Sequence, residues 1–242
     1  MLIGQDRVNG HGVGGDNELG AEIMQADVDQ VMTALDTRIS AETEAVFVVA
    51  GLGGGTGSGG APVLTRRLSR IYDIPIYALG ILPGTDEGAL YQVNAGRSLK
   101  TLAGEADAVV LIDNDAWKDA GESLEAGYEA INQNIAKRVG LLLAAGEPTE
   151  GVAETVVDTS EIINTLRSGG IASLGFASAT AAEEAAKNIN VITSTTRKAV
   201  LNGGSLPGAT KADSALLIVA GQPERISRKG VEKARKWLET ET

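Results

Sequence analysis

The hydrophobic pattern of the first half of the chain alternates between short apolar runs and helical repeats. Continuous short runs are typical of strands buried on both faces of a parallel sheet, and three such strands are expected, at residues 45–50, 74–82 and 108–112. Apolar positions at helical spacing predict helices over residues 17–35, 63–71 and 87–102. We expect the second helix to begin near Pro62, since proline is favoured in the first turn of a helix. Alternating strands and helices predict an α/β domain with a parallel sheet.

A long helix is predicted in the middle of the chain, from an N-cap at Ser123 to about residue 145. Its apolar stripe consists of Leu124, Tyr128, Ile131, Ile135, Val139 and Leu142. Such a helix is roughly 34 Å long, enough to link two domains. Beyond it, strands are expected at residues 171–177 and 215–220, and helices at residues 191–201 and from Ser227 onward. The predicted domains are residues 1–122, a linking helix over 123–146, and an α+β domain over 147–242.

The chain is strongly acidic, with a net charge of −11 and a pI of about 4.6. Two interpretations stay open: an ordinary solvated acidic surface, or adaptation to high intracellular salt. Under both interpretations the acidic surface repels nucleic acid and anionic membranes, so nucleic acid and membranes are not expected as general partners. The absence of cysteine excludes disulfides and thiolate metal sites. No apolar run approaches the ~18–20 residues that span a bilayer, and the start lacks a secretory signal, so we expect a cytoplasmic protein.

The first predicted strand is followed directly by a glycine run with the sequence Gly53-Gly54-Gly55-Thr56-Gly57-Ser58-Gly59. A glycine turn between a strand and a helix can bind phosphate, because its amide N–H groups and the helix N-terminus attract anions. Thr56 and Ser58 add hydroxyl donors. The alternative is a tight turn that only packs strand on helix. Six glycines between residues 53 and 60 are more than a turn needs, which favours phosphate binding.

Three kinds of phosphate loop could account for this segment. A Walker A loop requires a lysine followed by serine or threonine, and the segment has no lysine. A dinucleotide fingerprint matches formally at Gly55, Gly57 and Gly60, but the acidic residue it requires could only be Asp73. That acid should close the second strand, whereas Asp73 precedes it. The dinucleotide interpretation is therefore weak.

The third kind fits best, because the sequence GGGTGSG at Gly53–Gly59 resembles the signature loop of the tubulin/FtsZ superfamily. Three further segments look most like the archaeal CetZ group: GHGVG at residues 10–14, DNELG at 16–20 and DNDAW at 113–117. The resemblance covers most of the chain. It implies a Rossmann-like parallel-sheet GTPase domain, a long central helix and a partial α+β C-terminal domain.

The resemblance also implies a guanine-nucleotide site that binds GTP or GDP, with Mg²⁺ held mainly through the nucleotide. The residues placed near the terminal phosphate and magnesium are Gly12, Gly14, Gly15, Asp16 and Asn17. Glu87 would meet the ribose, Asn114 and Asn132 would contact guanine, and Tyr128 would stack on it. From spacing alone, Tyr128 could equally belong to the core stripe. FtsZ proteins place an arginine shortly after the matching glutamate, and Ala89-Leu90-Tyr91 stands here instead.

The hydrolytic residues implied by the resemblance are Asp158 and Glu161, on the loop that enters the nucleotide site of the next subunit. From sequence alone, two carboxylates three residues apart at a helix start read as capping. His11 is expected to be a solvent-facing loop residue rather than a metal ligand. The resulting hypothesis is a GTPase that polymerises head-to-tail and controls cell shape. FtsZ-like cell division and a non-hydrolysing, tubulin-like structural or regulatory role are the alternatives.

The resemblance is incomplete at both ends. Family members begin with a strand and two turns that hold the inner phosphates and ribose, and no such glycine turn precedes Leu2. They also continue past the final helix. We therefore expect this chain to be part of a longer protein.

Overall fold

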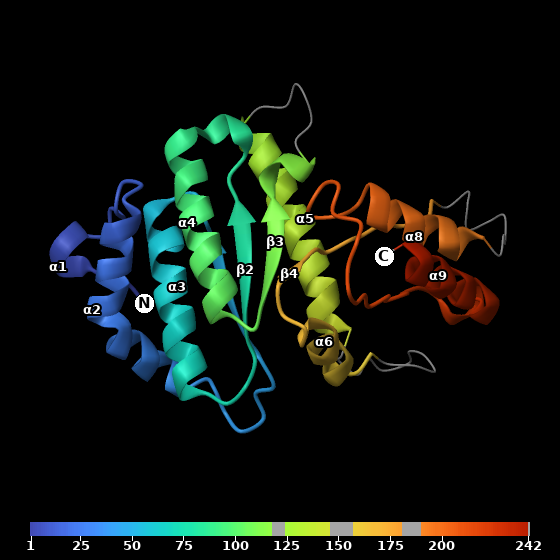
Figure 1. Ribbon diagram of the computed structural model, residues 1–242, viewed down its shortest axis with the longest axis horizontal. Helices are drawn as coiled ribbons and strands as arrows, with labels where there is room; N and C mark the ends of the chain where they lie inside the picture. The colour runs from blue at the N-terminus through green and yellow to red at the C-terminus, as the bar shows by residue number, and fades with distance from the viewer. Residues whose placement is uncertain (118–123, 146–156, 181–189, 242) are drawn as a thin grey trace. The chain divides into compact units, whose positions relative to one another are not determined.

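The computed structural model describes residues 1–117, 124–145, 157–180 and 190–241 (Figure 1). The chain divides into two compact units, which are described separately. The first consists of Met1–Asp115 together with Gly169–Ala172, and the second of Ala116–Ser168 together with Ser173–Thr242. The predicted N-cap Ser123 and the end of the linking helix at residue 146 lie outside the described residues.

The first unit is built on a parallel sheet with the strand order β1-β2-β3-β4. The strands are β1 (Val46–Gly51), β2 (Ile76–Leu82), β3 (Ala108–Asp113) and β4 (Ile171–Ala172). The central strands β2 and β3 are almost fully buried, with Ile76 and Ile112 at 0% exposure. Burial on both faces explains why these strands appear as continuous apolar runs, and the predicted parallel α/β architecture is confirmed.

The helices of the first unit pack side by side in the order α2, α3, α4 (Figure 1). Their bounds are α1 (Gln5–Val8), α2 (Asn17–Asp36), α3 (Gly55–Ile71), the short η1 (Thr85–Glu87) and α4 (Ala89–Glu105). Glycines allow α2 and α3 to approach closely. A Cβ atom on Gly20 would lie 2.2 Å from the Gly55 carbonyl oxygen, and one on Gly59 would lie 2.2 Å from the Asn17 carbonyl oxygen. Part of the glycine run therefore serves helix packing.

Helix α3 begins earlier than the sequence predicted. It starts at Gly55, so most of the glycine run is helical and Pro62 lies inside the helix instead of near its start. A proline in this position removes the helical hydrogen bond to the Ser58 carbonyl. Glycine is a poor helix former, so the early start depends on tertiary packing of the first two turns against α2.

The second unit contains mainly helices. They are α5 (Leu124–Ala144), α6 (Thr159–Leu166), α8 (Val191–Leu201), the short η3 (Pro223–Arg225) and α9 (Arg228–Glu241), and η2 (Asn114–Trp117) leads into this unit. The predictions of a long central helix and of helices near residues 191 and 227 are confirmed. Helices α8 and α9 pack against each other.

Of the two strands predicted in this half of the chain, one is shorter than expected and the other does not form. The expected strand over residues 171–177 is limited to Ile171–Ala172, because the next amides bond to the turn after α8: Leu174 donates to Ser205 Oγ and Phe176 to the Gly203 carbonyl. Residues 215–220 are apolar but form no strand in the structure. An apolar run becomes a strand only when a neighbouring strand pairs with it, and sequence alone does not reveal that neighbour.

A buried arginine stabilises the second unit and was missed in the sequence. Arg138 of α5 is only 7% exposed, and its guanidinium lies 4.2 Å from the centroid of the Trp117 ring and 5.5 Å from that of Phe176. It donates a hydrogen bond of 3.0 Å to the Gly203 carbonyl. Burial lowers the pKa of Arg138. The side chain therefore joins α5 to the Gly203 turn through stacking as well as hydrogen bonding.

Candidate functional site

Three loops follow the carboxyl ends of neighbouring strands in the first unit. The glycine run follows β1, residues 83–88 follow β2, and Asn114 follows β3. Because these strands are parallel and adjacent, their following loops meet at one edge of the sheet, where open α/β sheets bind ligands. The structure thus brings together the segments that the sequence singled out in this unit.

The start of α3 offers backbone donors to open space. Gly54 is the N-cap of this helix, and the N–H groups of the first turn have no partner within a helix. A Cβ atom on Gly54 would meet no atom within 4 Å, and Thr56 in the first turn is exposed. Oriented N–H groups, the helix dipole and a nearby hydroxyl form an arrangement that suits phosphate.

Other residues of the run have structural contacts of their own. A Cβ atom on Gly57 would lie 2.2 Å from the Gly51 carbonyl oxygen, so this glycine permits α3 to pack against the end of β1. The Ser58 side chain is 1% exposed; its hydroxyl donates to the Gly54 carbonyl at 2.5 Å and accepts from Asn17 Nδ2 at 2.9 Å. This geometry differs from the expected hydroxyl donor to phosphate, because the Ser58 hydroxyl is directed into the protein and supports the loop.

The loop at residues 10–15 lies beside the first turn of α3. Gly12, Gly14 and Gly15 have φ angles of 73°, 61° and 84°, a left-handed conformation that other residues adopt only with strain. A Cβ atom on Gly12 would be 3.8 Å from Thr56 Oγ1. Asp16 then caps α2, its Oδ1 accepting from the Leu19 amide at 3.0 Å. Glycine is thus required here for the turn itself.

A hollow of about 350 Å³ opens next to this loop. It is lined by Gly14, Gly15, Asp16, Asn17, Glu18, Leu90, Asn94 and Arg97. Asn94, which the sequence analysis did not single out, is 2% exposed and its Nδ2 donates to the Gly15 carbonyl at 2.8 Å and to the Gly53 carbonyl at 2.9 Å. The signal in the sequence was an amide on the same helical face as Ser98 and Leu102, which are also buried.

Glu87 and Asn114 are hydrogen-bonded to each other. Glu87 Oε1 accepts from Asn114 Nδ2 at 3.2 Å and from the Gly84 amide at 2.7 Å. Asp115 Oδ2 also accepts from the Thr85 amide at 2.8 Å. These bonds join the loop after β2 to the residues after β3. The predicted ribose and base residues of the first unit therefore form one connected group.

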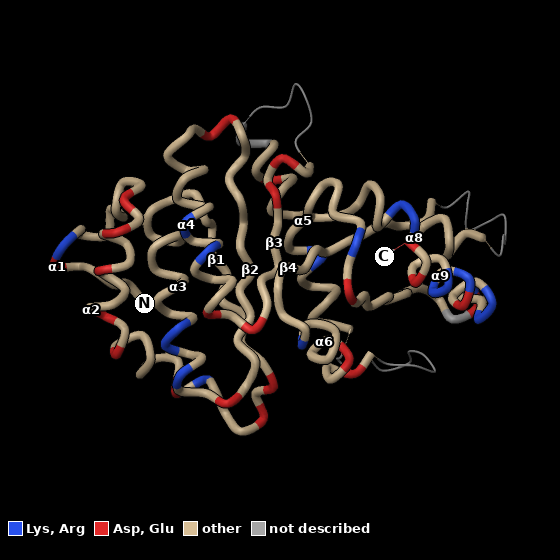
Figure 2. Tube along the Cα trace, viewed as in Figure 1, with Lys and Arg blue, Asp and Glu red and all other residues tan. Residues whose placement is uncertain are grey.

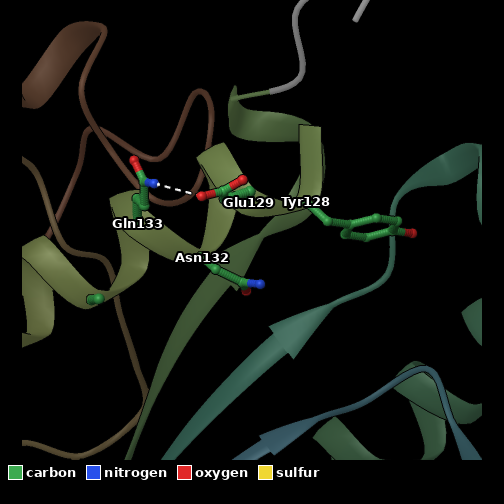
Figure 3. Close-up of a pocket in the computed structure, with 5 residues that line it drawn as sticks. Tyr128, Glu129, Asn132 and Gln133 are labelled. Atoms are coloured by element: carbon green, nitrogen blue, oxygen red, sulfur yellow. Dashed lines mark hydrogen bonds between the residues drawn. The ribbon is translucent and has the colours of Figure 1, made fainter. Parts of the chain in front are cut away.

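Tyr128 and Asn132 lie on α5 in the second unit, along a hollow of about 690 Å³ (Figure 3). Glu129, Gln133 and Ala136 also line it, and Gln133 Nε2 donates to Glu129 Oε1 at 3.2 Å. Tyr128 is 39% exposed, whereas Ile131 of the same predicted stripe is 2% exposed. Tyr128 is thus outside the buried stripe, and its ring and the Asn132 amide project from one face of α5 (Figure 3).

Asp158 and Glu161 lie at the start of α6, also in the second unit. Asp158 is the N-cap and accepts from the Ser160 amide at 3.0 Å, so the capping interpretation holds for this residue. Both residues are exposed, and a cap uses only one carboxylate oxygen. His11 is exposed as well. Among the described residues, no group of three or more His, Cys, Asp or Glu side chains is placed to hold a metal ion.

Two protein-family models together match the whole chain. Residues 1–122 match the tubulin/FtsZ family GTPase domain, and residues 121–242 match the tubulin-like CetZ C-terminal domain. The tubulin-like protein CetZ2 of Haloferax volcanii is 70% identical over 242 residues, which are 100% of this chain and 67% of that protein. Within the described part of the chain, no helix is long and apolar enough to cross a membrane.

Two solved structures of proteins from Haloferax volcanii are closely similar to this chain. The GTPγS-bound protofilament of CetZ2 has a TM-score of 0.92 at 68% identity, with 100% of this chain and 70% of that chain covered. The GDP-bound monomer of CetZ1 has a TM-score of 0.88 at 50% identity, with 100% and 69% covered. The chain spans about two thirds of the length of the Haloferax volcanii CetZ proteins that it matches. It belongs to the tubulin/FtsZ superfamily, a family of cytoskeletal GTPases, and within it to the CetZ group.

Proposed function

We propose that the protein binds GTP with magnesium, hydrolyses it, and assembles head-to-tail into filaments. The observation that carries the proposal is the open N-terminus of α3. Gly54 has no atom near the position of a Cβ, and Thr56 is exposed beside the left-handed glycines of residues 10–15. That arrangement suits the phosphates of a nucleotide. The CetZ2 relative was solved with GTPγS and the CetZ1 relative with GDP.

Guanine recognition is assigned to three residues. Asn114 presents an amide beside Glu87, and an amide can donate to and accept from a base edge. Tyr128 and Asn132 share one face of α5 (Figure 3), where the exposed ring can stack on a base and the amide can pair with it.

Magnesium would be held mainly through the phosphates, because Mg²⁺ keeps several waters and takes only one or two protein carboxylates. The residue that fits is Asp16, which is exposed and whose Oδ1 alone is used by the cap of α2. The bound ion would supply charge neutralisation on the phosphates. Asp16 and the backbone N–H groups of α3 would orient them for attack.

Hydrolysis is assigned to Asp158 and Glu161, acting on the nucleotide of a neighbouring subunit. Their exposure at the start of α6 allows contact with a second copy, and carboxylates can orient or activate a water molecule. Head-to-tail contacts that do not close into a ring produce a filament, and the CetZ2 structure is a protofilament. Each contact between subunits would then complete one active site.

The cellular role that we propose is control of cell shape from the cytoplasm, with the chain itself as principal partner and no binding to nucleic acid. A role in division, as in FtsZ proteins, is the nearest alternative. A non-hydrolysing, tubulin-like role is favoured less, because Asp158 and Glu161 are both present and exposed.

The rate of phosphate release from GTP, measured as a function of protein concentration, tests the proposal. If the neighbouring subunit completes the site, the specific activity is near zero below a threshold concentration and rises steeply above it. A specific activity that is the same at all concentrations would contradict hydrolysis between subunits. Absence of GTP binding at any concentration would contradict the proposal as a whole.

A further inference from the structure

Helix α4 carries two amide side chains that reach all three loops of the candidate site. Asn94 Nδ2 donates to the Gly15 carbonyl at 2.8 Å and to the Gly53 carbonyl at 2.9 Å. Two residues earlier, Gln92 Nε2 donates to the Gly84 carbonyl at 2.8 Å. Residues 10–15, the glycine run and residues 83–88 are therefore all attached to one helix.

The Asn94 contact depends on the chemistry of its side chain. A primary amide nitrogen carries two hydrogens, and each is directed at a carbonyl from a different loop. The side chain is 2% exposed, so water does not replace these bonds readily when they are lost. Gly15 is the last left-handed glycine of its loop and Gly53 is the first glycine of the run, so the amide fixes the two loops at the point where they come together.

We propose that Asn94 is a positioning residue that sets the separation of the two phosphate-binding loops and thereby lets the site distinguish GTP from GDP. This inference rests on the proposed nucleotide site. The terminal phosphate is the group that the loop at residues 10–15 is assigned to contact, and the glycine run is assigned to the same phosphate chain. A ligand that engages both loops depends on their separation, whereas a ligand without the terminal phosphate depends on it less.

The test is equilibrium titration of the full chain with GTPγS and with GDP, comparing the unchanged protein with Asn94→Asp. The replacement keeps the shape but directs carboxylate oxygens at two carbonyls. We expect the ratio of GTPγS affinity to GDP affinity to fall about tenfold, because part of the free energy of the two lost hydrogen bonds appears as weaker binding of the terminal phosphate. An unchanged ratio would overturn the inference, including the case in which both affinities weaken equally. If the unchanged chain binds neither nucleotide, the proposed function fails and this inference fails with it.

Two further variants separate positioning from damage to the fold. Asn94→Gln keeps both donor hydrogens but places them one methylene further out, so we expect an intermediate fall in the ratio of GTPγS affinity to GDP affinity. If Asn94→Asp does not fold, an unchanged ratio in Asn94→Gln contradicts the inference. Asn202→Asp makes the same chemical change at an exposed position at the end of α8, and its ratio should equal that of the unchanged protein.

A pH series supplies a readout that a purely structural role would not produce. In Asn94→Asp, lowering the pH protonates the new carboxyl group and restores one hydrogen-bond donor. Discrimination should therefore recover in part at acidic pH in this variant but not in Asn94→Leu, which has the same shape and no titratable group. Parallel pH profiles in the two variants would count against the positioning role.

Discussion

Individual glycines in the run have different physical roles, although they look equivalent in the sequence. Gly54 faces open space at the helix N-terminus, whereas Gly57 and Gly59 lie against backbone carbonyls. The number of glycines in the sequence favours phosphate binding, but packing accounts for part of that number. The argument for phosphate depends on Gly54, Thr56 and the left-handed glycines of residues 10–15.

Gly57→Ala tests the packing role. The new Cβ atom would lie 2.2 Å from the Gly51 carbonyl oxygen, so α3 must shift, and we expect a loss of roughly 1–3 kcal/mol in the free energy of unfolding. Gly96→Ala is the matched control, because Gly96 is an exposed glycine within α4 with no atom near the added Cβ. It should gain roughly 0.5–1 kcal/mol from improved helix propensity. Urea unfolding measures both, and equal effects of the two substitutions would contradict the packing account.

Glu161→Ala tests the assignment of the hydrolytic carboxylate. Glu161 is exposed and is not the cap of α6, so its removal should leave the helix intact. We expect filaments that form with GTP and persist, with little phosphate release. Sedimentation and phosphate assays carried out together measure this. Asp158→Ala is less informative, because it also removes the N-cap, at about 1 kcal/mol. Rapid turnover in Glu161→Ala would count against the role.

The sequence predicted that several candidate site residues follow the ends of neighbouring strands, but it did not predict their contacts. Asn114, Glu87 and the glycine loops were placed by motif, and the structure brings them to one edge of the sheet. The inward direction of the Ser58 hydroxyl and the two bonds of Asn94 depend on which helix faces are buried. That burial is decided by how α2, α3 and α4 pack, which a single sequence does not specify.

At the scale of elements, prediction succeeded where a local pattern determines the structure. Strands β1, β2 and β3 and the long helix α5 have strong patterns and were found close to their observed bounds. The prediction of a strand at residues 215–220 was wrong, because strand formation depends on a pairing partner elsewhere in the chain. The predicted start of α3 was too late, because glycine has a low helix propensity and this part of the helix is formed by tertiary packing.

The ends of α2 and α3 are joined by a hydrogen bond that should respond to alkaline pH. The Tyr72 hydroxyl donates to the Asp36 carboxylate, and this bond is the main reason that the pKa of Tyr72 is raised above its ordinary value of 10.0. Because the folded-state pKa is higher than the unfolded one, the stabilising contribution is complete below pH 10.0 and is lost as the pH rises through the folded-state pKa.

Tyr72→Phe removes this contribution at every pH. The unchanged protein should therefore be the more stable of the two at neutral pH, and the difference should shrink as the pH rises beyond the pKa of Tyr72. Urea unfolding of both proteins across this range measures it, and comparing the pair cancels the titration of shared groups. A difference that stays constant into the alkaline range would show that the hydrogen bond is not its source.

At the scale of the whole molecule, Asp and Glu residues are scattered along both units. Lys and Arg residues also occur in both, and α9 carries five of them beside three Glu residues (Figure 2). The two interpretations of the net charge, a solvated surface or adaptation to high salt, both remain compatible with this distribution.

Family membership was predictable because a seven-residue signature and several further segments occur in order along the chain.

The central claim is that one subunit binds the nucleotide and its neighbour supplies the hydrolytic carboxylates. Mixing two inactive variants tests it most directly: Glu161→Gln, which keeps the glycine loops, and a double substitution of Gly54 and Thr56 by Asp, which repels phosphate but keeps Glu161. Each variant alone should release almost no phosphate from GTP. In the mixture, some neighbouring pairs combine an intact binding loop with an intact Glu161, so a fraction of the activity of the unchanged protein should return. A mixture that is no more active than its components, although both variants enter the same filaments, would contradict the claim.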